Sequence, residues 1–113
     1  IMIDHDKSPS ILSATIIDEL YSVILSRKNT GNPDTSYSAL MFSKGINKIA
    51  QKVGEEGVET AIAAVSENKE RLLEESADLL YMLLLLWAAK DVQPNEVYKV
   101  LEKRSVKNIH NDE

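Results

Sequence analysis

Hydrophobic residues recur along this chain mostly at helical spacing, and no segment shows the sustained alternation typical of a strand. Paired apolar positions between residues 10 and 28 predict a first amphipathic helix of about 18 residues, with Ser8 as its cap and Pro9 in its first turn. A loop rich in Asn, Gly, Pro and Asp follows. Ser36 then suits the cap of a shorter helix that reaches Gly45.

Three further helices are expected downstream. The first runs from Ile46 to about Val65, and the second, after a turn at "SENK", covers the strongly apolar segment 70–90. After "DVQPN", Gln93 or Asn95 leads into a last amphipathic helix. The sequence therefore predicts an all-α protein of four or five helices. Its single domain is expected at residues 10–108, between a polar extension at 1–9 and a polar tail at 109–113.

The helix at 70–90 is apolar around most of its circumference, and such a helix must be enclosed on all sides. A chain of 113 residues can hardly enclose it alone, so we expect a helical bundle completed by dimerisation or by a larger assembly. The alternative is a monomer with an exposed apolar patch.

Composition narrows the possible functions. The net charge of −5 argues against general nucleic-acid binding, because neutralising a phosphate backbone needs a basic surface. The absence of cysteine excludes disulfides and thiolate chemistry, and it suits a cytoplasmic location. The first ten residues are polar and the longest uncharged stretch is the segment 79–89, so no signal peptide or membrane span is expected.

Acidic residues gather in the stretch "QKVGEEGVETAIAA", residues 51–64. At about 100° per residue, Glu55, Glu56 and Glu59 are expected on one arc of the helix. The opposite face is expected to contain Ile46, Ile49, Ala50, Val53, Gly57, Ala61 and Ala64. On the next helix, Glu75 and Asp78 are three residues apart and therefore neighbours. Since eleven uncharged residues follow Asp78, free solvation of this carboxylate is not expected.

These acids would repel one another if the two helices faced each other. At about 5 Å and an effective dielectric constant near 20, each pair of like charges costs roughly 3 kcal/mol. Hard divalent cations with oxygen ligands relieve such repulsion, and Mg²⁺ typically joins protein carboxylates to substrate phosphates. We therefore predict a Mg²⁺ site between a Glu-x-x-Glu helix and a Glu-x-x-Asp helix. The alternative is that these acids form salt bridges with nearby lysines or lie at helix starts.

Basic and amide side chains lie just upstream of the acids. Lys44, Lys48 and Lys52 follow one another at i, i+4 and i+8, with Asn47 and Gln51 beside them. Such donors next to a metal site suit a polyphosphate ligand, although a solvated lysine face is the alternative. Neither histidine has the spacing of a metal ligand, and no Ser-His-Asp arrangement is supported.

The segments "SYSALMFSKGINKIAQKVGEEGVETAIAA" and "EESADLLYMLLLL" together resemble the phosphoribosyl-ATP pyrophosphatases of histidine biosynthesis. This family belongs to the MazG-like all-α nucleotide pyrophosphohydrolases, whose signature is E-E-x-x-E followed by E-x-x-D. The resemblance implies hydrolysis of phosphoribosyl-ATP to phosphoribosyl-AMP and pyrophosphate, with Mg²⁺, by a homodimer or related oligomer.

The resemblance also implies roles for individual residues. Metal ligands are expected at Glu56, Glu59, Glu75 and Asp78, and substrate contacts at Lys44, Asn47, Lys48, Gln51 and Lys52. Glu55 and Glu56 are the catalytic candidates, with Glu55 one step back from the metal or orienting the attacking water. Two other functions stay open: a house-cleaning pyrophosphohydrolase for deoxy- or non-canonical nucleotides, and a non-enzymatic helical interaction module whose acids are structural.

Overall fold

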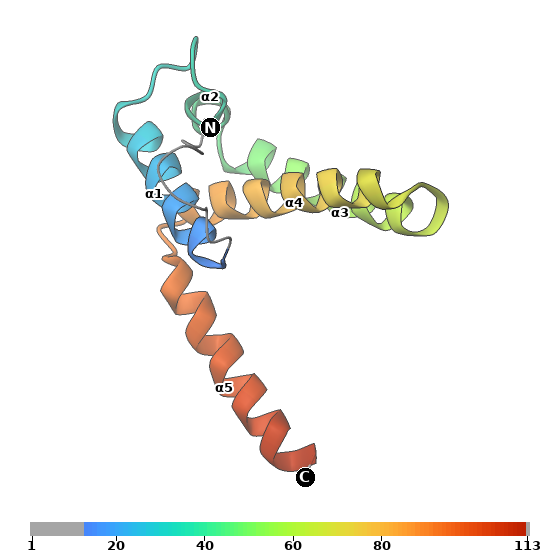
Figure 1. Ribbon diagram of the computed structural model, residues 1–113. Coiled ribbons are helices and arrows are strands. Elements are labelled where there is room, and N and C mark those ends of the chain that lie inside the picture. Colours follow the sequence, from blue (N-terminus) through green and yellow to red (C-terminus); the bar gives the residue numbers. More distant parts are fainter. Residues whose placement is uncertain (1–12, 113) are drawn as a thin grey trace, which may run out of the picture.

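The structure is a computed structural model that describes residues 13–112, with side-chain surroundings given up to residue 105 (Figure 1). The described chain forms five helices and no strand: α1 (Thr15–Thr30), α2 (Tyr37–Lys44), α3 (Ile46–Ser66), α4 (Lys69–Ala89) and α5 (Pro94–Asp112). The all-α prediction is confirmed. Ser8 and Pro9, with the predicted extension at 1–9, lie outside the described residues. The helix α5 continues to Asp112, past the predicted domain limit at residue 108.

Side-chain caps account for the starts of α2 and α4. The Ser36 hydroxyl accepts the Ala39 N–H at 3.1 Å at the start of α2, which confirms the predicted cap. At the predicted "SENK" turn, the Asn68 side chain accepts the Arg71 N–H at 2.9 Å. The first helix begins later than predicted, at Thr15, because the preceding two residues form a turn instead of a helix.

Gly45 separates α2 from α3. Its φ of +95° lies in the region that favours glycine, and its N–H closes α2 on the carbonyl oxygens of Met41 and Phe42. Lys44 therefore ends α2, whereas Lys48 and Lys52 belong to α3. The three lysines at i, i+4 and i+8 therefore do not share one continuous helix, as the predicted break at Gly45 implied.

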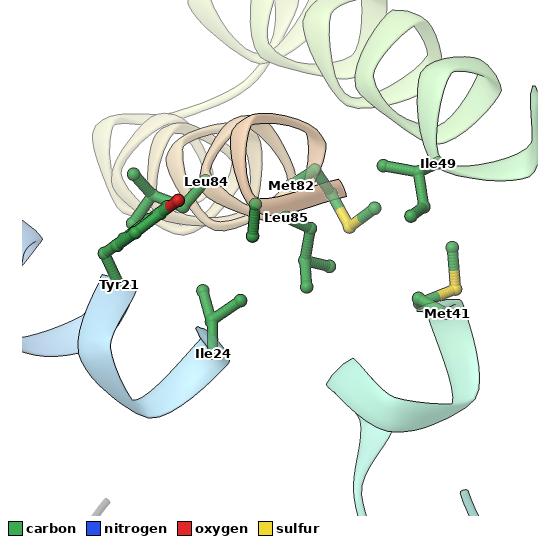
Figure 2. Packing of buried hydrophobic residues seen from close by; sticks show 8 residues of the cluster. Tyr21, Ile24, Met41, Ile49, Met82, Leu84 and Leu85 are labelled. Atoms are coloured by element: carbon green, nitrogen blue, oxygen red, sulfur yellow. The ribbon is translucent and has the colours of Figure 1, made fainter. Parts of the chain in front are cut away.

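The helices α3 and α4 lie side by side as an antiparallel pair, and α1 and α2 pack against one end of it (Figure 1). Figure 2 shows the core at that end, where apolar side chains from four helices point toward one another. The cluster consists of Tyr21 and Ile24 of α1, Met41 of α2, Ile49 of α3, and Met82, Leu84, Leu85 and Ala88 of α4. The packed end thus holds α3 and α4 together and leaves their other ends free of α1 and α2.

Polar contacts fix the segment between α4 and α5. The Tyr21 hydroxyl donates to the Val92 carbonyl at 2.7 Å. The Lys28 ammonium donates to the Ala88 carbonyl at 2.7 Å and pairs with Asp91 at 3.1 Å. From this anchored segment, α5 extends away from the other four helices (Figure 1).

The buried face of α3 differs from the predicted one. It consists of Ile49, Val53, Glu56, Thr60 and Ala63, whose alternating spacing of four and three residues is typical of packing against a second helix. Ala50, Ala61 and Ala64, which were expected on the packed face, are exposed. Periodicity showed which residues of α3 share a face, but it could not show which face packs against α4.

Within residues 13–112, no helix combines the length and the hydrophobicity that crossing a bilayer requires.

Candidate active site

Three carboxylates meet where α3 and α4 face each other. Glu56 of α3 and Glu75 and Asp78 of α4 each offer one oxygen, and these oxygens all lie within 4.8 Å of one another. The Glu56 side chain is 12% exposed and that of Glu75 is 7% exposed. Asp78 is exposed, contrary to the expectation that it avoids solvent, and it forms the open rim of the cluster. The structure thus brings together three of the four predicted metal ligands.

Thr60 joins the two helices at the level of these acids. Its hydroxyl lies 2.7 Å from the Glu56 carbonyl and 3.1 Å from the Glu75 carbonyl, and it donates to both. These carbonyls belong to the two buried acids themselves. The hydroxyl therefore fixes how far α3 is shifted along α4, and with it the separation of the carboxylates. Sequence reasoning missed this residue because only the fold places it opposite Glu75.

The Glu56 carboxylate lies in an unfavourable environment. Burial raises its pKa, the charges of Glu59, Asp78 and Glu75 raise it further, and Lys52 opposes them weakly from 3.9 Å. Its Oε2 atom is buried and has no hydrogen-bond partner among the described residues. Leaving such an atom unpaired costs free energy. Because the Glu56 carboxylate lies beside two more carboxylates, a hard divalent cation fits this donor set.

Arg71 partly neutralises the cluster on the α4 side. Its Nη2 lies 2.7 Å from Glu75 Oε2, and its other terminal nitrogen pairs with Glu74. The spacings of four and three residues bring these side chains together on one helical face. Arg71 was not among the predicted site residues, although its spacing from Glu75 was visible in the sequence. Arg71 thereby orients one oxygen of Glu75, and its positive charge reduces the repulsion between the carboxylates of Glu75 and Glu56.

The other two acids of the motif lie beside the cluster. The Glu55 carboxylate accepts a hydrogen bond from the Gln51 amide at 2.8 Å and lies 3.5 Å from the Lys52 ammonium. These two contacts, the Gln51 bond first, hold the pKa of Glu55 below its usual value. Glu59 is exposed and outside the group of three, although its charge raises the pKa of Glu56. Their predicted roles as water-orienting acid and metal ligand stay predictions.

The predicted phosphate-binding residues divide into two sets. Gln51 and Lys52 contact Glu55, and Lys48 is near enough for its charge to lower the pKa of that carboxylate. Lys44 and Asn47 are exposed at the junction of α2 and α3. The structure therefore brings Lys48, Gln51 and Lys52 together beside the acids. It leaves Lys44 at the end of α2 and Asn47 in the first turn of α3, both exposed.

The chain is similar to known proteins over most of its length. A family model described as phosphoribosyl-ATP pyrophosphohydrolase matches residues 17–105. A Paramagnetospirillum magneticum protein named phosphoribosyl-ATP pyrophosphatase is 56% identical over 90 residues, which cover 80% of this chain and 82% of that protein. Proteins of the same name from Azospirillum brasilense and Saccharolobus solfataricus are each 48% identical over 93 residues, covering 82% of this chain and 83% and 98% of their own lengths. The chain therefore belongs to the phosphoribosyl-ATP pyrophosphohydrolase family.

Proposed function

We propose that this protein hydrolyses phosphoribosyl-ATP to phosphoribosyl-AMP and pyrophosphate, a step of histidine biosynthesis, and that it requires Mg²⁺. The observation that carries the proposal is the cluster of Glu56, Glu75 and Asp78, whose carboxylate oxygens lie within 4.8 Å of one another in a chain of this family. Two of these side chains are nearly buried, and Glu56 Oε2 has no hydrogen-bond partner among the described residues. A cluster of acids with a purely structural role would not be expected to leave a buried carboxylate oxygen without a hydrogen-bond partner.

Glu56, Glu75 and Asp78 would hold Mg²⁺, with Glu59 as a further ligand once its side chain turns toward Glu56. When bound, the ion would neutralise charge on the polyphosphate and lower the pKa of a coordinated water. Arg71 keeps its bond to one Glu75 oxygen, which leaves the other oxygen free. The protein's own task is thus to hold a fixed set of oxygens at the junction of the two helices.

The neighbouring polar residues divide binding and proton transfer between them. Lys48, Gln51 and Lys52 would bind oxygens of the triphosphate, because they lie together next to the acids. Glu55 has a lowered pKa and is ionised at neutral pH. Phosphate oxygens would take over the hydrogen bonds of Gln51 and Lys52 when the substrate binds. The Glu55 carboxylate would then be free to accept a proton from the attacking water, whose attack breaks the bond between the α- and β-phosphates.

We also propose that the protein acts as a homodimer. Apolar side chains form one stripe on the outer face of α3 and another on α4, and they are between 48% and 84% exposed: Val58, Ile62, Val65, Leu73 and Leu80. Apolar patches of this kind on a soluble domain generally mark an interface. A second copy would cover both stripes and enclose α4, which this chain leaves open on one side.

A substrate panel tests the proposed activity. Purified protein with Mg²⁺ is incubated with phosphoribosyl-ATP, dUTP and dCTP, and pyrophosphate release is measured for each. We expect rapid release from phosphoribosyl-ATP and little from the deoxynucleotides. Turnover of dUTP or dCTP with none of phosphoribosyl-ATP would instead indicate a house-cleaning pyrophosphohydrolase. No turnover and no Mg²⁺ binding would indicate a helical interaction module.

A further inference from the structure

Tyr37 is the first residue of α2, and the residue is 48% exposed to solvent. Large aromatic side chains bury most of their surface when their only task is packing. The Tyr81 ring of α4 lies behind that of Tyr37, with the ring centroids 6.0 Å apart and the planes tilted by 35°. One side of Tyr37 is therefore supported by protein, while much of the ring stays available to a ligand.

Several contacts hold this ring in place. The Ser36 cap fixes the backbone at the start of α2. The next residue, Ser38, is 6% exposed and shares a hydrogen bond with the Tyr81 hydroxyl. The Tyr37 hydroxyl itself donates to the Met82 sulfur at 3.9 Å. An exposed ring that is ordered in advance loses little conformational entropy when a ligand binds to it.

The ring lies next to the candidate active site. Tyr81 and Met82, its two partners on α4, follow Asp78 by one helical turn on the same side of the helix. On the α3 side, the Lys52 ammonium lies 3.9 Å from Glu56. Tyr37 thus packs against α4 residues that lie one turn of helix beyond Asp78 of the carboxylate cluster.

We propose that Tyr37 is the platform on which the purine base of the nucleotide stacks while its phosphates lie at the carboxylate cluster. This inference rests on the proposed function and adds a base-binding subsite to it. Every nucleobase has a π face, and stacking on an aromatic side chain contributes substantially to binding without requiring specific hydrogen bonds. The supporting Tyr81 ring and the fixed start of α2 keep the platform in one orientation against α4.

The test separates binding of the base from binding of the phosphates. ATP contains both parts, whereas inorganic tripolyphosphate contains only the phosphate chain. Equilibrium binding of each probe in the presence of Mg²⁺ is measured by calorimetry for the wild type, Tyr37→Ala and Tyr37→Phe. We expect Tyr37→Ala to weaken ATP binding by about 5- to 150-fold and to leave tripolyphosphate binding unchanged, and Tyr37→Phe to bind both probes as the wild type does.

Other outcomes overturn the inference. It is wrong if Tyr37→Ala binds ATP normally, if both probes weaken by the same factor, or if the wild type binds tripolyphosphate as tightly as ATP. It is also wrong if Tyr37→Ala changes the oligomeric state in sedimentation, because the ring would then be an interface residue. Tyr37→Leu, which keeps an apolar side chain, replaces Tyr37→Ala if the latter fails to fold. Turnover of phosphoribosyl-ATP by the wild type is recorded in parallel, so failure of the proposed activity is distinguished from failure of this subsite.

Discussion

Replacing Glu56 by glutamine is expected to stabilise the metal-free protein. The Glu56 side chain is 12% exposed, its Oε2 atom lacks a hydrogen-bond partner among the described residues, and its pKa is raised by burial and by three neighbouring acids. Glutamine has nearly the same shape but no charge, so it removes the repulsion without creating a cavity. If the Glu56 carboxylate only stabilised the fold, its replacement by glutamine would lower the stability of the protein.

The size of the effect follows from the geometry. Two unit charges 4.8 Å apart at an effective dielectric constant of about 20 repel each other by about 3 kcal/mol. Arg71 offsets the charge of Glu75, Asp78 is screened by solvent, and Lys52 loses a weak attraction to Glu56. The net gain is therefore expected to be roughly 1 kcal/mol, or a rise in Tm of about 4 °C for a domain of this size.

The gain should also depend on pH. Because the pKa of Glu56 is raised in the folded protein, the folded state binds this proton more tightly than the unfolded state does. Below the ordinary glutamate value of 4.5, Glu56 is protonated in both states and its repulsion is absent. The destabilisation of the wild type grows as the pH rises through the raised pKa. The difference between the two proteins is therefore largest near neutral pH and disappears in acid.

Thermal unfolding in EDTA and in millimolar Mg²⁺, at equal protein concentration, measures both effects. Mg²⁺ is expected to raise the Tm of the wild type, since a ligand that binds only the folded state stabilises it, and to have little effect on Glu56→Gln. Glu70→Gln, which removes an exposed acid from the first turn of α4, is the matched control. A lower Tm for Glu56→Gln in EDTA, or an equal response of both proteins to Mg²⁺, would refute the reasoning.

Two further predictions concern the helix pair. Thr60→Val should weaken Mg²⁺ binding several-fold with a loss of stability of about 1 kcal/mol, and Thr60→Ser should restore Mg²⁺ binding. The control is Ser66→Ala, which removes a hydrogen bond only to the Ile62 carbonyl of its own helix. Equal Mg²⁺ affinity in all variants would exclude a positioning role for Thr60. Ile62→Lys, on the exposed stripe of α3, should shift sedimentation from dimer to monomer. The control Val23→Lys on α1 should sediment as the wild type does. A wild type that sediments as a monomer would contradict the proposed interface.

Helix boundaries could be predicted largely from local signals. The cap at Ser36, the turn at "SENK" and the stop before Pro94 each depend on residues close in sequence, and the structure has them where they were expected. The start of the first helix was misplaced because its pairs of apolar residues continue upstream of Thr15. Periodicity shows which residues suit a helix but does not show where the helix begins.

The site could be predicted only in part, because it depends on which stripe of α3 faces α4. The sequence spacing of Glu75 and Asp78 already implied a pair, and the structure has both in the cluster. The resemblance to the family already set Glu56 at the metal and Glu55 one step back. Spacing alone did not distinguish Glu56, which joins the cluster, from Glu55, which pairs with Gln51 and Lys52. That choice is made by the packing of α3 on α4 as a whole. Thr60 and Tyr37 were missed for the same reason, since their partners lie on another helix.

Pyrophosphate release from phosphoribosyl-ATP, measured with Mg²⁺ and with EDTA, tests the central claim most directly. The wild type and the Glu70→Gln control are expected to release pyrophosphate only with Mg²⁺. Asp78→Asn, which alters the exposed member of the cluster and should fold normally, is expected to lose nearly all activity. Pyrophosphate release by the wild type in EDTA, or a wild-type rate for Asp78→Asn, would contradict the assignment of the carboxylate cluster as a metal-dependent active site.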